Sequence, residues 1–83
     1  MKIKKKIQSA PDLRAIGRRI RELRGFDLSQ EDFGRVLGVG QAAVSKFEKG
    51  LSFPSVEILI KLKEFSGRSL DWIITGEDPQ KLE

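Results

Sequence analysis

Apolar residues recur every three to four positions in several short segments of the chain, which is the spacing of a single buried helix face. In the first of these segments, Pro11 and Asp12 suit the start of a helix and Gly25 suits its end. Its apolar positions are Leu13, Ile16, Ile20 and Leu23. Arginines occupy the other side, so the segment predicts an amphipathic helix that Gly25 terminates.

The segment LSQEDFGRVLG predicts a second helix. Ser29 and Asp32 have the spacing of a capping box at its start, with Asp in place of the usual Glu or Gln, and Gly38 suits its end. Its predicted apolar face consists of Phe33, Val36 and Leu37.

The segment LGVGQAAVSKFEKG predicts a third helix from Gln41 to Lys49, ended by Gly50. Val44 and Phe47 have the spacing of its buried side, and Val39 is an apolar residue in the turn before it. A helix of about two turns is not stable alone in water, so these apolar side chains must attach it to a core.

The remaining pattern predicts two more helices. Pro54 and Ser55 are suited to start one from about Val56 to Phe65, and Ser69 is suited to cap a short one from Leu70 to Thr75. The predicted buried side of the fourth helix is Val56, Leu59, Ile60 and Phe65, with Leu62 partly buried. No segment alternates with the two-residue period of a strand.

Five short helices, none able to bury its apolar side alone, predict a compact all-α bundle. We expect its core to contain Leu23, Phe33, Leu37, Val44, Phe47, Leu59, Phe65 and Ile73. The predicted organisation is a basic flexible arm at 1–10, one domain at 11–77, and a polar tail or linker at 78–83. Such an ending would suit a linker to a further C-terminal domain.

Charge is distributed unevenly along the 83 residues, whose formal net charge is +4. Residues 1–24 hold nine Lys or Arg against two Asp or Glu, whereas residues 25–83 hold seven against ten. A basic N-terminal third indicates a polyanionic partner, but a solvated basic tail and arginine-rich helix face would give the same pattern. Both interpretations stay open at this stage.

The composition excludes several classes of site. There is no cysteine or histidine, so thiolate metal sites, disulfides and the commonest general base are absent, and we expect no cofactor and a cytoplasmic location. The acidic pairs Glu31/Asp32 and Glu77/Asp78 are sequence neighbours, which do not face each other on a helix. No apolar run is long enough to span a membrane. We therefore expect a protein that is not an enzyme.

Two helices joined by a tight glycine-containing turn, the second short and polar on its open side, indicate a helix-turn-helix. A recognition helix enters a major groove about 12 Å wide, so its outward side chains must be small, or polar and extended. The outward residues of 41–49 are of this kind.

The motifs LSQEDF, LGV, VSKFEKG, PS and SLDWIITGE, in this order, carry a resemblance to a known family. Across residues 16–77 the chain resembles the Cro and phage-repressor type of helix-turn-helix regulators, the XRE-like family. The resemblance implies a lambda-repressor-like fold. It also implies sequence-specific binding of double-stranded DNA, usually as a homodimer on a palindromic operator, and most often repression.

The resemblance assigns roles residue by residue. Gln30 matches a position that contacts a phosphate and braces the recognition helix. The positions implied to face bases are Gln41, Ala42, Ser45 and Lys46, with a phosphate as the other target for Lys46. Lys49 and the backbone from Gly50 to Ser52 match phosphate contacts, which position a protein without reading sequence. Arg24 and Glu48 match an ion pair that holds the recognition helix; the other interpretation is a weak surface pair.

The sequence departs from the family pattern at several places. Gly40 stands where a Ser or Thr usually caps the recognition helix, which removes a side-chain cap and one phosphate donor. The turn GFD is one residue shorter than is typical, and the loop GLSFP lacks basic residues. The arm lysines Lys2, Lys4, Lys5 and Lys6 either replace those charges or do nothing.

Two questions about partners remain open from sequence. Trp72 either packs inside the domain or, with Ile74, contacts a second copy. The alternative function is an antitoxin-like or adaptor module that uses the same fold to bind a protein. An apolar patch around Leu51, Phe53 and Trp72 would favour that alternative.

Overall fold

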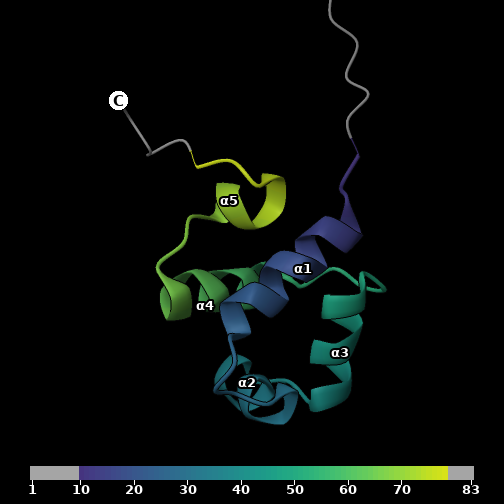
Figure 1. Cartoon of the computed structure of the whole chain (residues 1–83), viewed down its shortest axis with the longest axis vertical. Helices are drawn as coiled ribbons and strands as arrows, with labels where there is room; N and C mark the ends of the chain where they lie inside the picture. Colours follow the sequence, from purple (N-terminus) through teal and green to yellow (C-terminus); the bar gives the residue numbers. More distant parts are fainter. Residues whose placement is uncertain (1–9, 79–83) are drawn as a thin grey trace, which may run out of the picture.

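A computed structural model of the chain describes residues 10–78, so nearly all of the predicted basic arm and of the polar tail lie outside the described residues. Five helices make up the described part (Figure 1). They are α1 (Leu13–Arg24), α2 (Gln30–Leu37), α3 (Gln41–Lys49), α4 (Val56–Ser66) and α5 (Leu70–Thr75). The all-α fold of five helices expected from the sequence is confirmed.

The helix starts follow from capping side chains. Asp12, Ser29, Ser55 and Ser69 each accept a hydrogen bond from the backbone N–H three residues later, at 3.0–3.3 Å. α2, α3, α4 and α5 each end at a glycine in the left-handed conformation. These local signals are why the predicted bounds agree with the structure, apart from α4, which continues one residue further to Ser66.

The core contains most of the residues predicted for it. Ten apolar side chains are buried, namely Ile16, Ile20, Phe33, Leu37, Val44, Phe47, Ile58, Leu59, Leu62 and Ile73. Leu23 is only half-buried. The prediction of Phe65 as a core residue was wrong, because its side chain is 43% exposed, although its ring makes an edge contact with the buried Phe33.

The buried side of α4 was also predicted wrongly. Ile58, Leu59 and Leu62 face the core, whereas Val56 and Ile60 are exposed. Most of the α4 sequence VEILIKL is apolar, so periodicity alone could not select the face that other helices cover. On α2, the predicted apolar residue Val36 is exposed as well, leaving Phe33 and Leu37 as the buried pair.

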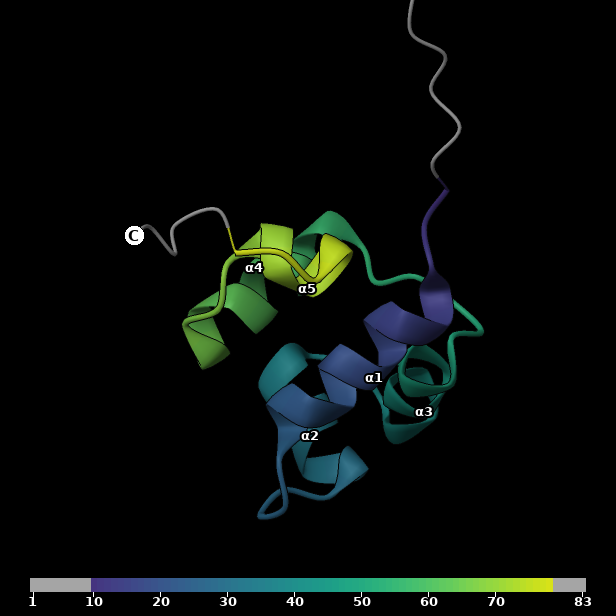
Figure 2. The ribbon, with the colours of Figure 1, turned by 45° about the horizontal axis from the view of Figure 1, so that its top comes forward.

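α1 occupies the middle of the molecule and packs against α3, α4 and α5 (Figures 1 and 2). α2 and α3 lie on one side of it, and α4 and α5 on the other (Figure 2). α1 and α3 approach closely because Gly17 has no side chain: a Cβ there would lie 2.5 Å from the carbonyl oxygen of Phe47. The position of α3 is therefore fixed by a backbone-to-backbone contact with α1.

Candidate functional site

α2, the turn at 38–40 and α3 form a helix-turn-helix. The turn is held by a hydrogen bond from the Val39 N–H to the carbonyl of Gly34, at 2.8 Å. A Cβ on Gly34 would lie 2.6 Å from the carbonyl oxygen of Val39, so this close turn requires glycine. Val39 packs against the core as a partly buried side chain, which agrees with its predicted place in the turn.

α3 presents one open side and attaches the other to the core. Val44 and Phe47 are buried, as the sequence predicts. Of the predicted contact residues, Gln41, Ala42, Lys46 and Lys49 are exposed, and Ser45 and Ser52 are half-buried. The structure therefore brings these residues onto one helix and the loop directly after it.

Gly40 is the N-cap residue of α3, with φ −82° and ψ 168°, and no side-chain hydrogen bond caps the helix. This is the departure from the family pattern that the sequence indicates. A Cβ at this position would meet nothing within 4 Å, so no steric reason requires glycine.

A chain of side-chain hydrogen bonds runs from α1 to the start of α3. Arg24 donates from Nε to Oε2 of Glu48 at 2.7 Å and from Nη2 to Oε1 at 3.0 Å. Glu48 Oε1 also accepts from Nε2 of Gln30 at 3.0 Å. Gln30 Oε1 in turn accepts from Nε2 of Gln41 at 2.8 Å. The chain thus links a buried carboxylate to an exposed amide at the first position of α3.

The predicted pair of Arg24 and Glu48 is present, and it is more than a surface contact. The side chains are 14% and 4% exposed, respectively, and Arg24 also donates to the carbonyl of Leu28 at 2.9 Å. The hydrogen bond to Glu48 raises the pKa of Arg24, against a lowering by burial. A raised arginine pKa means that the pair's stabilising effect is complete below the ordinary pKa and is lost only at higher, strongly alkaline pH.

The charge on Glu48 fixes the direction of every bond in this chain. An ionised carboxylate only accepts hydrogen bonds, so Gln30 must turn its NH₂ group toward Glu48. Its carbonyl oxygen then faces Gln41, which must donate from its own NH₂ group. The exposed Gln41 is left with its carbonyl oxygen and one N–H without a partner among residues 10–78. Local sequence patterns contain no signal for such a chain, because its bonded pairs are 11, 18 and 24 positions apart.

Other polar contacts hold α5 against α1. Arg19 donates to the carbonyls of Ile73 and Ile74 at 2.9 and 3.0 Å. Trp72 is half-buried against the core, and the Arg68 guanidinium lies 3.7 Å from the centre of its ring. The packing interpretation of Trp72 is therefore supported, although part of its surface stays exposed.

Large apolar side chains are exposed at two places, and only Leu51 and Phe53 among them are considered as exposed from the sequence. Phe26 is fully exposed in the turn after α1, directly after Gly25, which ends the helix with φ 75° and ψ −163°. Val56 and Ile60 are exposed on α4. Leu51 and Phe53, in the loop before α4, are also large exposed apolar residues. Among residues 10–78 no group of acidic side chains could hold a metal ion, and no helix is long and apolar enough to cross a membrane.

Comparisons with known proteins agree with this geometry. A family model described as Helix-turn-helix matches residues 18–73. The chain is 33% identical over 61 residues to the HTH-type transcriptional activator BcrR of Enterococcus faecalis, covering 72% of this chain but only 30% of that protein. It is 33% identical over 54 residues to an uncharacterized HTH-type transcriptional regulator of Methanocaldococcus jannaschii, covering 65% of this chain and 82% of that protein. The structure of the P22 c2 repressor protein with a synthetic operator matches with a TM-score of 0.69 and 30% identity, over 75% of this chain and 96% of that one.

Proposed function

This chain belongs to the helix-turn-helix family of the Cro and phage-repressor type, and from that membership we propose that it is a sequence-specific DNA-binding transcriptional regulator. The DNA-binding unit is residues 11–77, and α3 is the helix that enters the major groove. The observation that carries the proposal is the hydrogen-bond chain that ends at the exposed amide of Gln41. The stability of the fold alone does not require that the buried carboxylate of Glu48 orient the exposed amide of Gln41, whereas binding of a ligand by that amide does.

The orientation of Gln41 matches adenine. In the major groove adenine offers an acceptor at N7 and a donor at N6, whereas guanine offers two acceptors. Gln41 retains one free N–H and its carbonyl oxygen, which pair with adenine N7 and N6, respectively. Guanine would place its O6 acceptor against the carbonyl oxygen of Gln41. The proposed preference for adenine therefore follows from the charge of Glu48 and not from Gln41 alone.

The remaining contacts are proposed from their positions on and after α3. The Ala42 methyl lies beside Gln41 on the open side and is suited to a thymine methyl group. Ser45 and Lys46 lie one turn further along and are assigned to base edges. Lys49 and Ser52, at the end of α3 and in the loop after it, are assigned to phosphates, together with Gln30 at the start of α2.

We further propose that the regulator binds a palindromic operator as a homodimer and represses transcription. One small module binds weakly, and two linked half-sites about one helical turn apart raise the affinity without new contacts within each half. The exposed apolar residues of the loop and α4 support a second copy as the partner. These residues are Leu51, Phe53, Val56 and Ile60, of which Leu51 and Val56 are 69% and 70% exposed.

Selection of bound duplexes from a random-sequence library tests the DNA-reading proposal. We expect one enriched, two-fold symmetric sequence with an adenine at the position nearest Gln41. Gln41→Ala should then weaken binding to that sequence by about 1–3 kcal/mol, roughly 5- to 150-fold, and leave binding to random DNA nearly unchanged. Glu64→Ala, an exposed change on α4, is the matched control. Equal losses on both duplexes would mean that Gln41 contacts only the backbone.

One observation favours a second function, an antitoxin-like or adaptor module. Of the apolar residues Leu51, Phe53 and Trp72 that would favour that alternative, Leu51 and Phe53 are exposed at 69% and 45%, whereas Trp72 is half-buried. The oligomeric state of the purified protein, measured by sedimentation, distinguishes a second copy of this chain from a different protein as the partner of these residues. A dimer that Leu51→Ser converts to a monomer supports the homodimer. A monomer that selects no DNA sequence would support the module that binds another protein.

A further inference from the structure

Three arginines on the exposed side of α1 have no hydrogen-bond or ion-pair partner among residues 10–78. They are Arg14, Arg18 and Arg21, and we call them the arginine row. Their spacing of four and then three residues places them along one helix face. The other two arginines of α1 are used by the fold: Arg19 donates to carbonyls of α5, and Arg24 pairs with Glu48. The fold therefore gives no reason for the arginine row.

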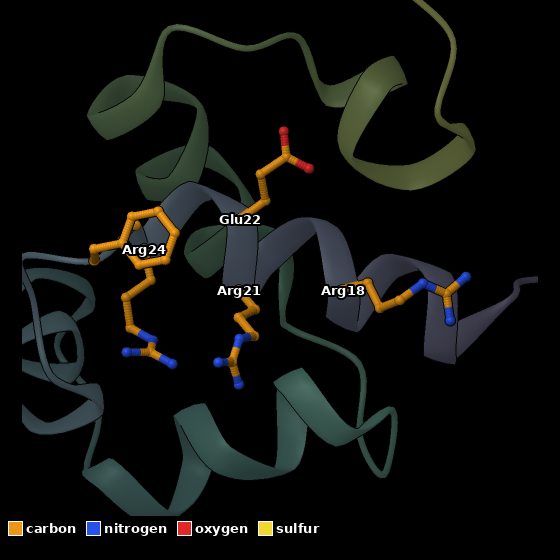
Figure 3. A pocket seen from close by; sticks show the side chains of 6 residues that line it. Arg18, Arg21, Glu22 and Arg24 are labelled. Atoms are coloured by element: carbon orange, nitrogen blue, oxygen red, sulfur yellow. The ribbon is translucent and has the colours of Figure 1, made fainter.

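Two members of the arginine row, Arg14 and Arg21, lie beside α3, whereas the side chain of Arg18 extends along α1 (Figure 3). At one end, a Cβ on Gly50 at the end of α3 would lie 3.0 Å from the Cα of Arg14. At the other end, Arg24 reaches Glu48. Between these two ends, Gly17 touches the α3 backbone. Arg14 and Arg21 lie about one helical turn before and after Gly17, and both are exposed, so they lie on either side of that contact. In Figure 3, Arg21 and Arg24 extend from α1 toward α3, whereas Glu22 points away from it.

We propose that the arginine row binds phosphates of the DNA strand that borders the groove entered by α3. This inference rests on the proposed function. Seven residues of helix extend about 10 Å, a length over which one DNA strand offers several phosphates, since these follow each other at about 3.4 Å along the duplex axis. A planar guanidinium can bind a phosphate through two hydrogen bonds, and no carboxylate competes for these side chains. The row accounts for three of the nine basic residues that lie before residue 25.

The salt dependence of binding tests this proposal. Each phosphate neutralised by the protein contributes about 0.9 to the slope of log affinity against log salt. We expect the double variant Arg14→Gln and Arg21→Gln to lower the slope by about 1.8 on a random-sequence duplex of about 20 base pairs. Raising the salt from about 50 to about 200 mM weakens the binding of both proteins. The fold loss of affinity should be about 12 times smaller for the double variant than for the wild type.

The control is the double variant Arg35→Gln and Lys63→Gln, which removes the same charge from exposed positions on α2 and α4. Its slope should stay within about 0.5 of the wild-type value, because Arg35 already pairs with Glu31 and Asp32, and Lys63 lies on α4. Adding Arg18→Gln to the first variant should lower the slope by about one more. Circular dichroism checks that every variant is folded.

The outcomes separate this inference from the proposed function. A slope that falls no more in the row variant than in the control overturns the inference, even where one DNA sequence is clearly selected. Such a result would instead point to an acidic protein partner, with the exposed Phe26 beside the row. A slope that falls as expected without any selected sequence leaves the row as a phosphate site and refutes base reading. A wild-type chain that binds no duplex overturns both.

Discussion

Replacing Glu48 with glutamine tests the link between the buried ion pair and base reading. Glu48→Gln keeps the size of the side chain and removes the charge that fixes the direction of the hydrogen-bond chain. The carboxylate accepts two bonds from Arg24 and one from Gln30. The new amide has one oxygen and one NH₂ group, so it cannot accept all three.

The loss of stability can be estimated from these contacts. Removing one partner of a fully buried pair costs about 3–5 kcal/mol. Here the cost should be lower, because Arg24 is 14% exposed and keeps its bond to the carbonyl of Leu28. The oxygen of the new amide also keeps one bond from Arg24. We expect a loss of about 2 kcal/mol, which for a domain of this size lowers Tm by roughly 8–16 °C.

The same change should alter specificity. When the oxygen of the new amide faces Arg24, its NH₂ group faces Gln30, whose own amide must rotate to accept. Gln30 then donates to Gln41, and Gln41 is left with both N–H groups free. Two donors match the two acceptors of guanine, so the preference at this base pair should move from adenine toward guanine by about 1–3 kcal/mol.

Thermal unfolding and anisotropy on two duplexes that differ at this one base pair measure both effects. Glu57→Gln is the control, since Glu57 is 77% exposed and pairs with Lys61 at 3.5 Å on the surface of α4. Its effect on stability should stay within about 0.5 kcal/mol. If Glu48→Gln and Glu57→Gln lower the stability by the same amount, the pair of Arg24 and Glu48 is no stronger than a surface pair. If stability falls but adenine stays preferred, Glu48 does not orient Gln41.

Three further variants test packing at single positions. Gly17→Ala should lower the free energy of unfolding in urea by about 1–3 kcal/mol and weaken DNA binding, because its Cβ would meet the carbonyl oxygens of Phe47 and Glu48 at 2.5 and 2.6 Å. Wild-type stability together with wild-type DNA affinity would refute the close contact. Gly40→Ser should stabilise by a few tenths of a kcal/mol through a new N-cap, and a loss above about 0.5 kcal/mol in the same assay would contradict the open space there. Phe26→Ser should change Tm by less than about 3 °C, since the ring buries no surface; a larger drop would mean that it packs in solution.

Local signals explain which parts of the fold the sequence predicts. Ser29, Ser55 and Ser69 cap the nearest turn, and glycines end the helices, so a few neighbouring residues determine each boundary. The buried side of α4 depends instead on distant elements. Val56 and Ile60 are as apolar as Ile58 and Leu62, and only the placement of the other helices leaves the first pair in solvent.

The candidate site divides in the same way. The small, polar open side of α3 can be read from Gln41 to Lys49 alone. The pair of Arg24 and Glu48 was available only through the family resemblance, because its members are 24 positions apart. The role of Gln30 in setting the direction of Gln41 depends on distances that no spacing rule contains. The full exposure of Phe26, in the turn after Gly25, has no signal in the composition.

The contacts at Gly17 and Gly34 have a consequence for how this protein would choose among DNA sequences. Backbone atoms meet backbone atoms at both places, at Gly17 with α3 and at Gly34 with the turn before α3, so no flexible side chain lies between the elements there to let α3 tilt. When such a stiff helix enters a groove of the wrong width, the duplex must change its shape instead. Bending a site of about 20–30 base pairs costs about 1–6 kcal/mol, depending on the flexibility of its steps. Bases that no side chain touches should therefore affect affinity, through the deformability of the operator.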